Sequence, residues 1–288
     1  MLLVSSALAI PLSFLLVRRI RKVTRATRKL VKGEFSYRIQ DTSQDELGQL
    51  ATYFNELAQT LEATDSARKR WIADISHELR TPLAVTSGEI EAMIDGIRPA
   101  TEQNLRSALE EIKHLNRLID DLYQLTNADI GALHYHKAPL DLGALVVNEL
   151  AHFQSAATQA GLSLKYTSTA SDIMLPADAS RLKQLLHNLI NNALKYTDAP
   201  GEIRVSLAQE NKHAVLCIED TAPGVPPESV SKLFDPLYRV ESSRSRKTGG
   251  SGLGLAICRQ IVLGHQGLIK AQPSALGGMK ITIHLPLV

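Results

Sequence analysis

A change of hydrophobic period near Pro139 constrains the fold of this 288-residue chain more than any other feature. Before this point, apolar residues recur at three- and four-residue spacing, which is typical of amphipathic helices. After it, helical stretches alternate with short runs in which apolar and polar residues take turns, the pattern of strands. We therefore expect helical modules, followed at 139–288 by a domain of helices and mostly antiparallel strands in a two-layer α/β sandwich.

The predicted elements of the region 139–288 have recognisable ends. A helix is expected from Leu142 to Ala160 and stops at Gly161, while Asp178 can cap a helix that extends to Tyr196. A third helix is expected over 253–263. The predicted strands are 162–168, 201–208, 213–219, 268–272 and 280–285.

Composition excludes several classes of protein. With 44% hydrophobic and 22% charged residues, the chain is too apolar to be disordered. Cys217 and Cys258 are too few for a disulfide framework and lack metal-site spacing, so we expect two buried small apolar side chains.

The N-terminal run from Met1 to Val17 carries no charge, and residues 18–32 then hold eight Lys or Arg and no acidic residue. An apolar run before a basic block predicts a transmembrane segment at 1–17 in the cell inner membrane, with the rest in the cytoplasm. Seventeen residues reach only about 25 Å against a core of ~30 Å, so the span is strained or its start is missing. A buried globular helix is the alternative. A signal peptide is not expected, because its basic residues should precede the apolar run.

The basic block favours lipid headgroups over nucleic acid because it adjoins the apolar run. The whole chain has 32 basic and 30 acidic residues, so the part outside 1–33 has 24 basic and 30 acidic residues, a net charge of −6. That part offers no basic surface, and we expect no direct contact with nucleic acid.

Residues 18–64 predict two helices joined by an extended connector. The first helix covers 18–32 and ends at Gly33, the connector covers 34–42, and the second helix covers 45–63. This order after a membrane segment, with Asp45-Glu46-Leu47-Gly48 opening the second helix, resembles a HAMP signalling module. An ordinary helical hairpin is the alternative.

Residues 65–132 predict a helical hairpin, with helices over 65–97 and 101–127 and a turn at 96–99. Each helix has one apolar stripe, which a lone hairpin would leave partly in water. Two hairpins that pair into a four-helix bundle would bury it, so we expect a homodimer. The seam of the second helix consists of Leu105, Leu109, Ile112, Leu115, Ile119 and Leu122.

His77 is the candidate nucleophile, although a lone histidine on a helix more often caps or packs. A neutral imidazole can attack phosphorus through one nitrogen, and the neighbouring Glu78 can take the proton from the other. Thr81 lies on the same face four residues later and could hold a water there. Pro82 removes a backbone donor and should bend the helix just past the histidine.

A second set of candidates suits a phosphorylated ligand. Asn188, Asn192 and Lys195 share one face of the helix at 178–196, where amide oxygens suit Mg²⁺ and a lysine suits phosphate. Asp220 ends a strand before a tight turn at Gly224, and its carboxylate could accept a hydrogen bond from an adenine amino group. The glycine-rich run 249–255 opens a helix whose N-terminus favours phosphate. A solvated helix face and flexible turns are the alternatives.

The order of these blocks resembles the sensor histidine kinases of two-component systems over nearly the whole chain. The blocks are His77 to Pro82, Asn188 to Tyr196, Asp220 to Gly224, Phe234 to Arg239 and Gly250 to Leu255. The resemblance implies an ATP-binding domain of the histidine kinase/Hsp90 type at 139–288. Two features depart from the family: Ala222 replaces the usual glycine, and a first membrane span with a sensor region is absent from this sequence.

The resemblance also implies an activity, which is ATP-dependent autophosphorylation of His77. The phosphoryl group would pass to an aspartate of a cognate response regulator, and the phosphorylated regulator would also be dephosphorylated. His77 would be the phosphoacceptor, Glu78 the general base and Thr81 the residue of the phosphatase reaction.

ATP and Mg²⁺ are the implied cofactors, and the resemblance assigns further residues to them. Asn188 and Asn192 would serve Mg²⁺-ATP, with Asn192 as the metal ligand, and Phe234 would help to seat a lid at 241–248. The other nucleotide-site residues implied are Lys195, Tyr196, Asp220, Gly224, Arg239, Gly250, Gly252 and Gly254.

Two other functions compete with this one. A Mg²⁺-ATPase of the Hsp90, gyrase and MutL group would share the α/β domain but would not need a histidine–glutamate pair on a dimerising hairpin. A scaffold in which phosphatase activity dominates would not need intact His77, Glu78, Asn192 and Asp220.

Overall fold

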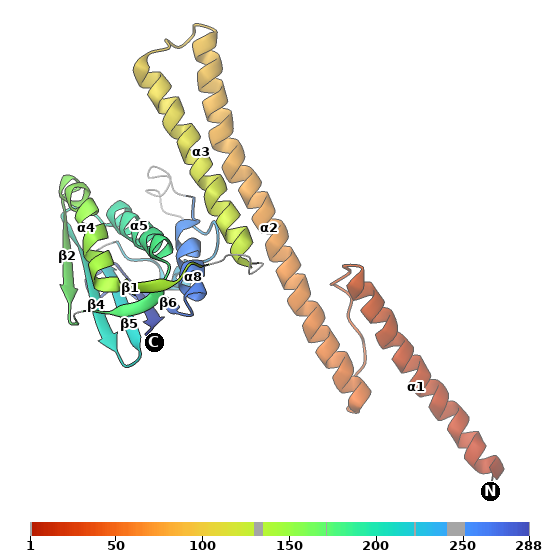
Figure 1. The fold of residues 1–288 in the computed structure, drawn as a ribbon. Coiled ribbons are helices and arrows are strands. Elements are labelled where there is room, and N and C mark those ends of the chain that lie inside the picture. The colour runs from red at the N-terminus through yellow and green to blue at the C-terminus, as the bar shows by residue number, and fades with distance from the viewer. Residues whose placement is uncertain (1, 130–134, 171, 222, 241–250, 288) are drawn as a thin grey trace. The chain divides into compact units, whose positions relative to one another are not determined.

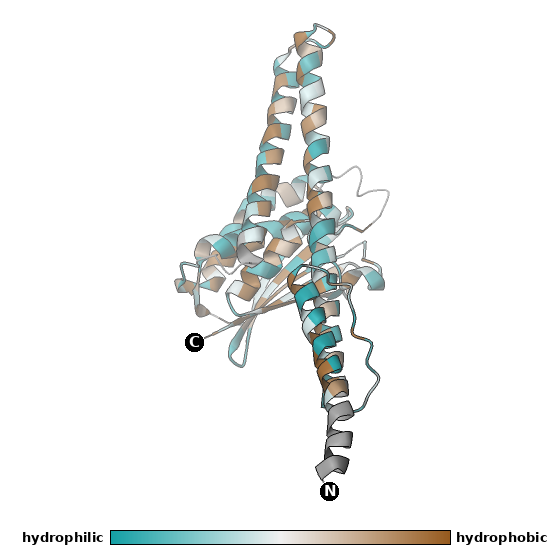
Figure 2. Cartoon of the chain, turned by 90° about the vertical axis from the view of Figure 1, so that its right-hand side faces the viewer, coloured by the Kyte–Doolittle hydropathy of each residue, from teal (hydrophilic) through white to brown (hydrophobic). Residues whose placement is uncertain are grey.

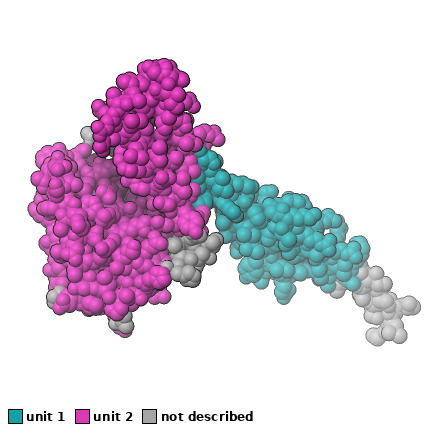
Figure 3. Space-filling view, turned by 45° about the horizontal axis from the view of Figure 1, so that its top comes forward, with its two compact units in different colours: residues 1–76 teal, residues 77–288 magenta. Residues whose placement is uncertain are grey.

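The computed structural model describes residues 2–129, 135–170, 172–221, 223–240 and 251–287. It divides into two compact units, Met1–Ser76 and His77–Val288, which Figure 3 colours separately. In chain order the elements are α1 (Leu2–Val31), α2 (Glu46–Ile94), α3 (Glu102–Asp129), β1 (Ala138–Asp141), α4 (Leu142–Gln159), β2 (Leu162–Ser168), β3 (Met174–Ala177), α5 (Ala179–Tyr196), β4 (Gly201–Glu210), β5 (His213–Asp220), α6 (Pro227–Val230), α8 (Gly254–Gly264), β6 (Leu268–Pro273) and β7 (Met279–Pro286).

The first unit packs α1, the connector and the start of α2 around a small core. The predicted stop of the first helix is confirmed, because Gly33 follows α1 with φ +84°, a left-handed conformation that glycine adopts without strain. Asn55 on α2 accepts a hydrogen bond from the backbone N of Ile39 (2.8 Å) and donates one to its carbonyl (3.0 Å). The buried residues of this core are Ala26, Ile39, Ala51, Phe54 and Ala58.

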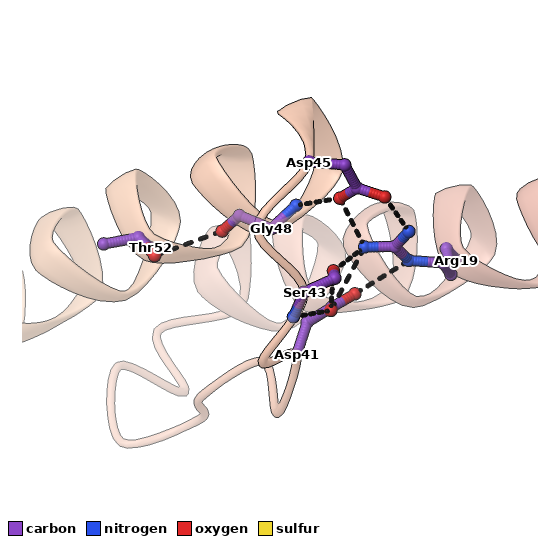
Figure 4. A network of polar contacts seen from close by, with 6 residues as sticks. All are labelled: Arg19, Asp41, Ser43, Asp45, Gly48 and Thr52. Atoms are coloured by element: carbon purple, nitrogen blue, oxygen red, sulfur yellow. Dashed lines mark hydrogen bonds and ion pairs between the residues drawn. The ribbon is translucent and has the colours of Figure 1, made fainter.

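A polar cluster joins α1, the connector and the first turn of α2 (Figure 4). The Arg19 guanidinium donates to Asp41 (3.0 and 3.1 Å) and to Asp45 (2.8 Å), and it also contacts Ser43. Hydrogen bonds from Ser43 and Arg19 lower the pKa of Asp41 to about 2. Asp45 Oδ1 accepts from the backbone N of Gly48 (2.9 Å), which satisfies one of the free N–H groups at the start of α2.

The helices predicted over 45–63 and 65–97 form a single helix, α2, of 49 residues. No glycine or proline stands between Gly48 and Pro82, so nothing ends the helix at the predicted boundary. Lys69 pairs with Asp65 at i,i+4 (2.7 Å) directly after it. Pro82 lies inside α2, which continues through it. In the part of the chain that the structure describes, no helix combines the length and the apolar character needed to cross a membrane.

The hairpin turn lies where the sequence predicts it, and Gly96 adopts φ +72° there. Arg98 holds the turn closed, because it donates to Glu89 on α2 (2.7 Å) and to Asn104 on α3 (3.0 Å). Figure 2 shows apolar residues recurring along both helices. Several members of the predicted seam of α3 remain exposed in a single chain: Leu105 (53%), Leu109 (49%), Ile112 (40%) and Ile119 (48%).

The region after Pro139 is a five-stranded sheet with the order β2-β4-β5-β7-β6, covered on one face by α4, α5 and α8 (Figure 1). Only the β2–β4 pair is parallel, so the predicted two-layer arrangement of helices and mostly antiparallel strands is confirmed. Cys217 and Cys258 are both buried and unpaired, as predicted.

A two-stranded sheet of β1 and β3 was not predicted from the sequence. Its strands have four residues each and pair antiparallel with Pro139 opposite Pro176. Prolines and short length hide the strand pattern, because proline is common only at strand edges and starts. The pair matters because β1 leads directly into α4 and β3 leads into the cap of α5.

Asp178 fixes the start of α5 through three backbone interactions. Its carboxylate accepts from the backbone N of Arg181 (3.2 Å) and of His136 (3.0 Å), which confirms the predicted cap. Its own backbone N donates to Nε2 of His265 (3.0 Å), beyond the end of α8. Because Nε2 accepts, Nδ1 carries the proton and donates to the Ile261 carbonyl (2.8 Å).

The neutral form of the buried His265 is therefore part of the folded structure. Burial lowers its pKa below the usual value of 6.5. The stabilisation from a neutral His265 is complete above pH 6.5 and is lost as the pH falls below that value, because the unfolded chain then binds the proton more readily.

We predict that His265→Leu lowers the free energy of unfolding by about 1–3 kcal/mol at pH 7.5, since the Asp178 N–H stays buried without an acceptor. The variant should also lose less stability than the unchanged protein between pH 7.5 and 5.5. Denaturant unfolding at both values measures this. The exposed His152 provides the control: if His152→Leu changes the pH dependence as much as His265→Leu does, the assignment is wrong.

Candidate functional site

The polar side of α5 presents three of the predicted residues. The leucine face predicted from spacing is buried against the sheet and α8, and this turns Asn188, Asn192 and Lys195 away from the core as half-buried side chains. Asn188 Nδ2 donates to the Gly254 carbonyl (3.3 Å) and thereby ties α5 to the start of α8. Burial, followed by the charge of Arg239, lowers the pKa of Lys195. Asn188, Asn192 and Lys195 therefore form one polar surface on α5.

Tyr196 ends α5 beside that surface. The Lys195 ammonium lies 5.2 Å from the Tyr196 ring centroid, and Tyr196 is 39% exposed, so this aromatic residue is accessible to a ligand. The end of α5 also meets the end of β5. A Cβ on Gly201 would lie 2.8 Å from both Thr197 Cγ2 and Thr221 Oγ1.

Asp220 is the last residue of β5 and is half-buried. It accepts a hydrogen bond from the backbone N of Met279 (2.7 Å), and burial raises its pKa. Among the described residues no donor reaches its other carboxylate oxygen, Oδ2. A half-buried carboxylate with one oxygen that has no hydrogen-bond donor is suited to accept from a ligand N–H.

The turn after Asp220 packs closely against a second turn. A Cβ on Gly224 would lie 3.2 Å from the Gly277 carbonyl, and Gly277 itself has φ +99°. Ala222, where the sequence departs from the family, lies outside the described residues.

The glycine-rich run is described from residue 251 onward, so Gly250 and the predicted lid at 241–248 lie outside the described residues. Gly252 (φ +68°) accepts at its carbonyl from the backbone N of Leu237 (3.0 Å), which also has a positive φ of 64°. A Cβ on Gly252 would lie 2.8 Å from the Leu237 carbonyl carbon. This backbone contact joins the segment that carries the half-buried Phe234 and Arg239 to the start of α8.

His77 and Glu78 lie on an exposed turn of α2. Thr81 is also exposed, and its hydroxyl donates to the His77 carbonyl (3.2 Å), so it lies over the histidine turn as predicted. Among the described residues no hydrogen bond or ion pair joins His77 or Glu78 to the α/β domain. The structure therefore brings the α5, β5 and α8 residues together and leaves His77 apart from them.

The donor set of the α5 surface fits Mg²⁺ bound to a polyphosphate. Mg²⁺ takes few protein ligands, all oxygens, and keeps waters and phosphates for the rest of its shell. Asn192 supplies an amide oxygen and Lys195 a cation, and among the described residues no cluster of three or more His, Cys, Asp or Glu could hold a metal.

Two contributors to this site carry no signal in the sequence. Leu237 supplies a left-handed backbone position and Met279 supplies a backbone N–H. Both act through the main chain, so residue type does not reveal them.

Three family descriptions match successive parts of the chain. Residues 177–288 match the histidine kinase-, DNA gyrase B- and HSP90-like ATPase family, residues 67–131 the His Kinase A phosphoacceptor domain, and residues 12–63 the HAMP domain. The chain is 45% identical over 287 residues to the signal transduction histidine-protein kinase BaeS of Escherichia coli K12. Over nearly its whole length this chain is similar to the sensor histidine kinases. The BaeS match covers 98% of this chain and 61% of that kinase.

Solved structures of histidine kinases also resemble this chain. The Acinetobacter baumannii histidine kinase AdeS matches with a TM-score of 0.63 and 28% identity, covering 73% of this chain and 98% of that one. The histidine kinase ThkA in complex with the response regulator TrrA matches with a TM-score of 0.62 over 80% of this chain and 66% of that one. At 20% identity the second match shows the fold of a histidine kinase alone.

We predict that Gly252→Ala and Gly254→Ala separate two roles of glycine at the start of α8. At Gly252 a methyl group meets backbone atoms at a positive φ, so the variant should lose about 1–3 kcal/mol of domain stability. At Gly254 a methyl group would make an ordinary contact of 3.8 Å with the Asn188 side chain, so stability should stay within about 0.5 kcal/mol.

Thermal unfolding and titration with a non-hydrolysable ATP analogue measure the two effects. If Gly254→Ala weakens analogue binding while stability is unchanged, Gly254 approaches the ligand. Equal destabilisation by both substitutions would contradict this division.

Proposed function

We propose that the chain is a membrane-bound sensor histidine kinase that phosphorylates His77 from ATP and passes the phosphoryl group to an aspartate of a response regulator. It would also dephosphorylate that regulator. The observation that carries the proposal is the exposed His77–Glu78 pair on a long helix, in a chain whose α5, β5 and α8 present the nucleotide-site residues of the family.

The nucleotide would lie along the polar side of α5. Asp220 would accept from the adenine amino group through its open oxygen, and Tyr196 would pack beside the ring. Lys195 and Arg239 would face the phosphates. Asn188 and Asn192 would serve Mg²⁺-ATP, with Asn192 as a ligand of the Mg²⁺, which when bound neutralises phosphate charge. Gly224, Gly250, Gly252 and Gly254 would shape the turns around the ligand.

On α2, His77 would attack phosphorus through one ring nitrogen while Glu78 takes the proton from the other. The exposure of both side chains leaves room for a second domain to reach them. Thr81, bonded to the His77 carbonyl, would orient a water for hydrolysis of the phosphorylated regulator.

The partner would be the receiver domain of a cognate response regulator, the class of protein found with ThkA. A homodimer would complete the hairpin, because the exposed leucines and isoleucines of α3 need a second hairpin to cover them. We place the dimerising hairpin at 65–132 and the ATP-binding domain at 139–288.

The N-terminal part would anchor the kinase in the cell inner membrane. The uncharged run at 1–17 would be the transmembrane segment, the basic residues after it would meet lipid headgroups, and 18–64 would form the HAMP module in the cytoplasm. The alternative, an ATPase without phosphotransfer, is not favoured because it leaves the phosphoacceptor domain at 67–131 without a role.

We predict that His77→Gln abolishes incorporation of γ-labelled phosphate, because glutamine offers no nucleophilic ring nitrogen. The label on the unchanged protein should be stable in base and labile in acid, as a phosphoramidate is. The half-buried His114 of α3 is not expected to accept phosphate, so His114→Gln should keep the label. Binding of an ATP analogue to His77→Gln should equal that of the unchanged protein. Acid-stable label, or label that persists in His77→Gln, would refute the assignment.

We predict that Glu78 and Thr81 serve different reactions. Glu78→Ala should lower autophosphorylation by about 10²-fold or more, since the general base is lost. Thr81→Ala should keep autophosphorylation within about twofold and lose dephosphorylation of the phosphorylated regulator. Both rates are measured with purified regulator. The same loss of both activities in Thr81→Ala would contradict the division.

A further inference from the structure

The hairpin and the ATP-binding domain pack together through one face of α3. Leu118 and Leu125, at i and i+7, are 6% and 3% exposed and belong to the same apolar cluster as Leu253 and Ile257 at the start of α8. Polar bonds frame this contact, because Gln124 accepts from Arg181 (3.1 Å) and Gln184 (2.8 Å) on α5. The packing surface therefore consists of an apolar contact between α3 and α8, with polar bonds from α3 to α5 beside it.

Asp121 is the acidic residue in the middle of that surface. It stands three residues after Leu118 and four before Leu125, so it shares their face of α3. Its side chain is partly buried, and among the described residues it forms no hydrogen bond or ion pair. A partly buried carboxylate without a partner opposes the contact that its apolar neighbours favour.

We propose that Asp121 is a positioning residue of the kinase, whose negative charge weakens the packing of the ATP-binding domain on α3 and whose protonation strengthens it. The proposal rests on the proposed function, because movement of that domain relative to His77 is what phosphoryl transfer requires.

The groups around Asp121 explain why its charge is not compensated. On its own helix, Asp120 repels it and Arg117 attracts it, while α8 presents the uncharged thiol of Cys258. Arg181 on α5, the cation of the facing helix in this contact, is bonded to Gln124 and Gln184. Burial, followed by the charge of Asp120, raises the pKa of Asp121 from 3.8 to about 6.

The raised pKa of Asp121 makes the packing of the ATP-binding domain on α3 depend on pH. When the domains separate, the carboxyl returns to water and to its usual pKa, so packing takes up a proton. Packing is therefore strongest at acidic pH and weakens as the pH rises towards the raised pKa of about 6. The packing equilibrium should fall roughly tenfold between pH 5 and pH 7.5.

Asp121→Asn tests this proposal, with Asp120→Asn as the matched control, because Asp120 is the exposed neighbour on the same turn. Hydrogen exchange of the amides in α8 and in the last two turns of α3 is measured on the whole chain at pH 5 and 7.5. Variants are compared at the same pH so that intrinsic exchange rates cancel, and amides of β5 report on the fold.

Asp121→Asn should show more protection of α8 and α3 than the unchanged protein, and this excess should be roughly tenfold larger at pH 7.5 than at pH 5. Asp120→Asn removes only the smaller cause of the raised pKa of Asp121, so its protection at pH 7.5 should lie much closer to that of the unchanged protein than to that of Asp121→Asn. The ratio of the autophosphorylation rates of the unchanged protein and Asp121→Asn should also change several-fold over this range. If the ratio stays constant, or if Asp121→Asn matches the unchanged protein at pH 7.5, the positioning role is wrong. Failure of every variant to label His77 would instead contradict the proposed function.

Discussion

The burial of one face of α5 against the sheet and α8 is the interaction on which the candidate site depends. Leu182, Leu185, Leu186 and Leu189 are each 1% exposed, and each contributes about 2 kcal/mol through the apolar area it removes from water. Because a helix is rigid, fixing this face also fixes the opposite one, where Asn188 and Asn192 lie. The Asp178 cap then sets where α5 begins, and the Asn188 amide reaches the start of α8.

Helix continuity is the corresponding constraint in the N-terminal half. Asp45 caps α2 while it is bonded to Arg19 on α1, and the helix that starts there runs without a break past His77 to Ile94. A change in the position of α1 therefore acts on the cap of the same helix that carries the candidate phosphoacceptor. The charges of this cluster are partly exposed, so the geometry that they fix matters more than the stability they add.

Local signals predicted the α/β elements well because each has a distinct start and stop. Gly161 follows the end of α4 with φ +71°, which glycine adopts because it has no side chain, and Asp178 starts α5 through its side-chain cap; both were identified from sequence. The β1–β3 pair was missed because its stability comes from a partner more than thirty residues away. The division of α2 into two helices was wrong because a boundary between family modules requires no break in the backbone.

The sequence by itself determined the residue types, their order and the periodicity of each helix. These properties place His77 beside Glu78, and Asn188 on one face with Lys195, because helical spacing acts over a few residues. Only the tertiary structure decided what these residues meet. The bond from Met279 to Asp220, the backbone contact of Gly252 with Leu237 and the position of Asp121 against α8 all join distant segments. Such contacts arise from packing of the whole domain, which no local pattern encodes.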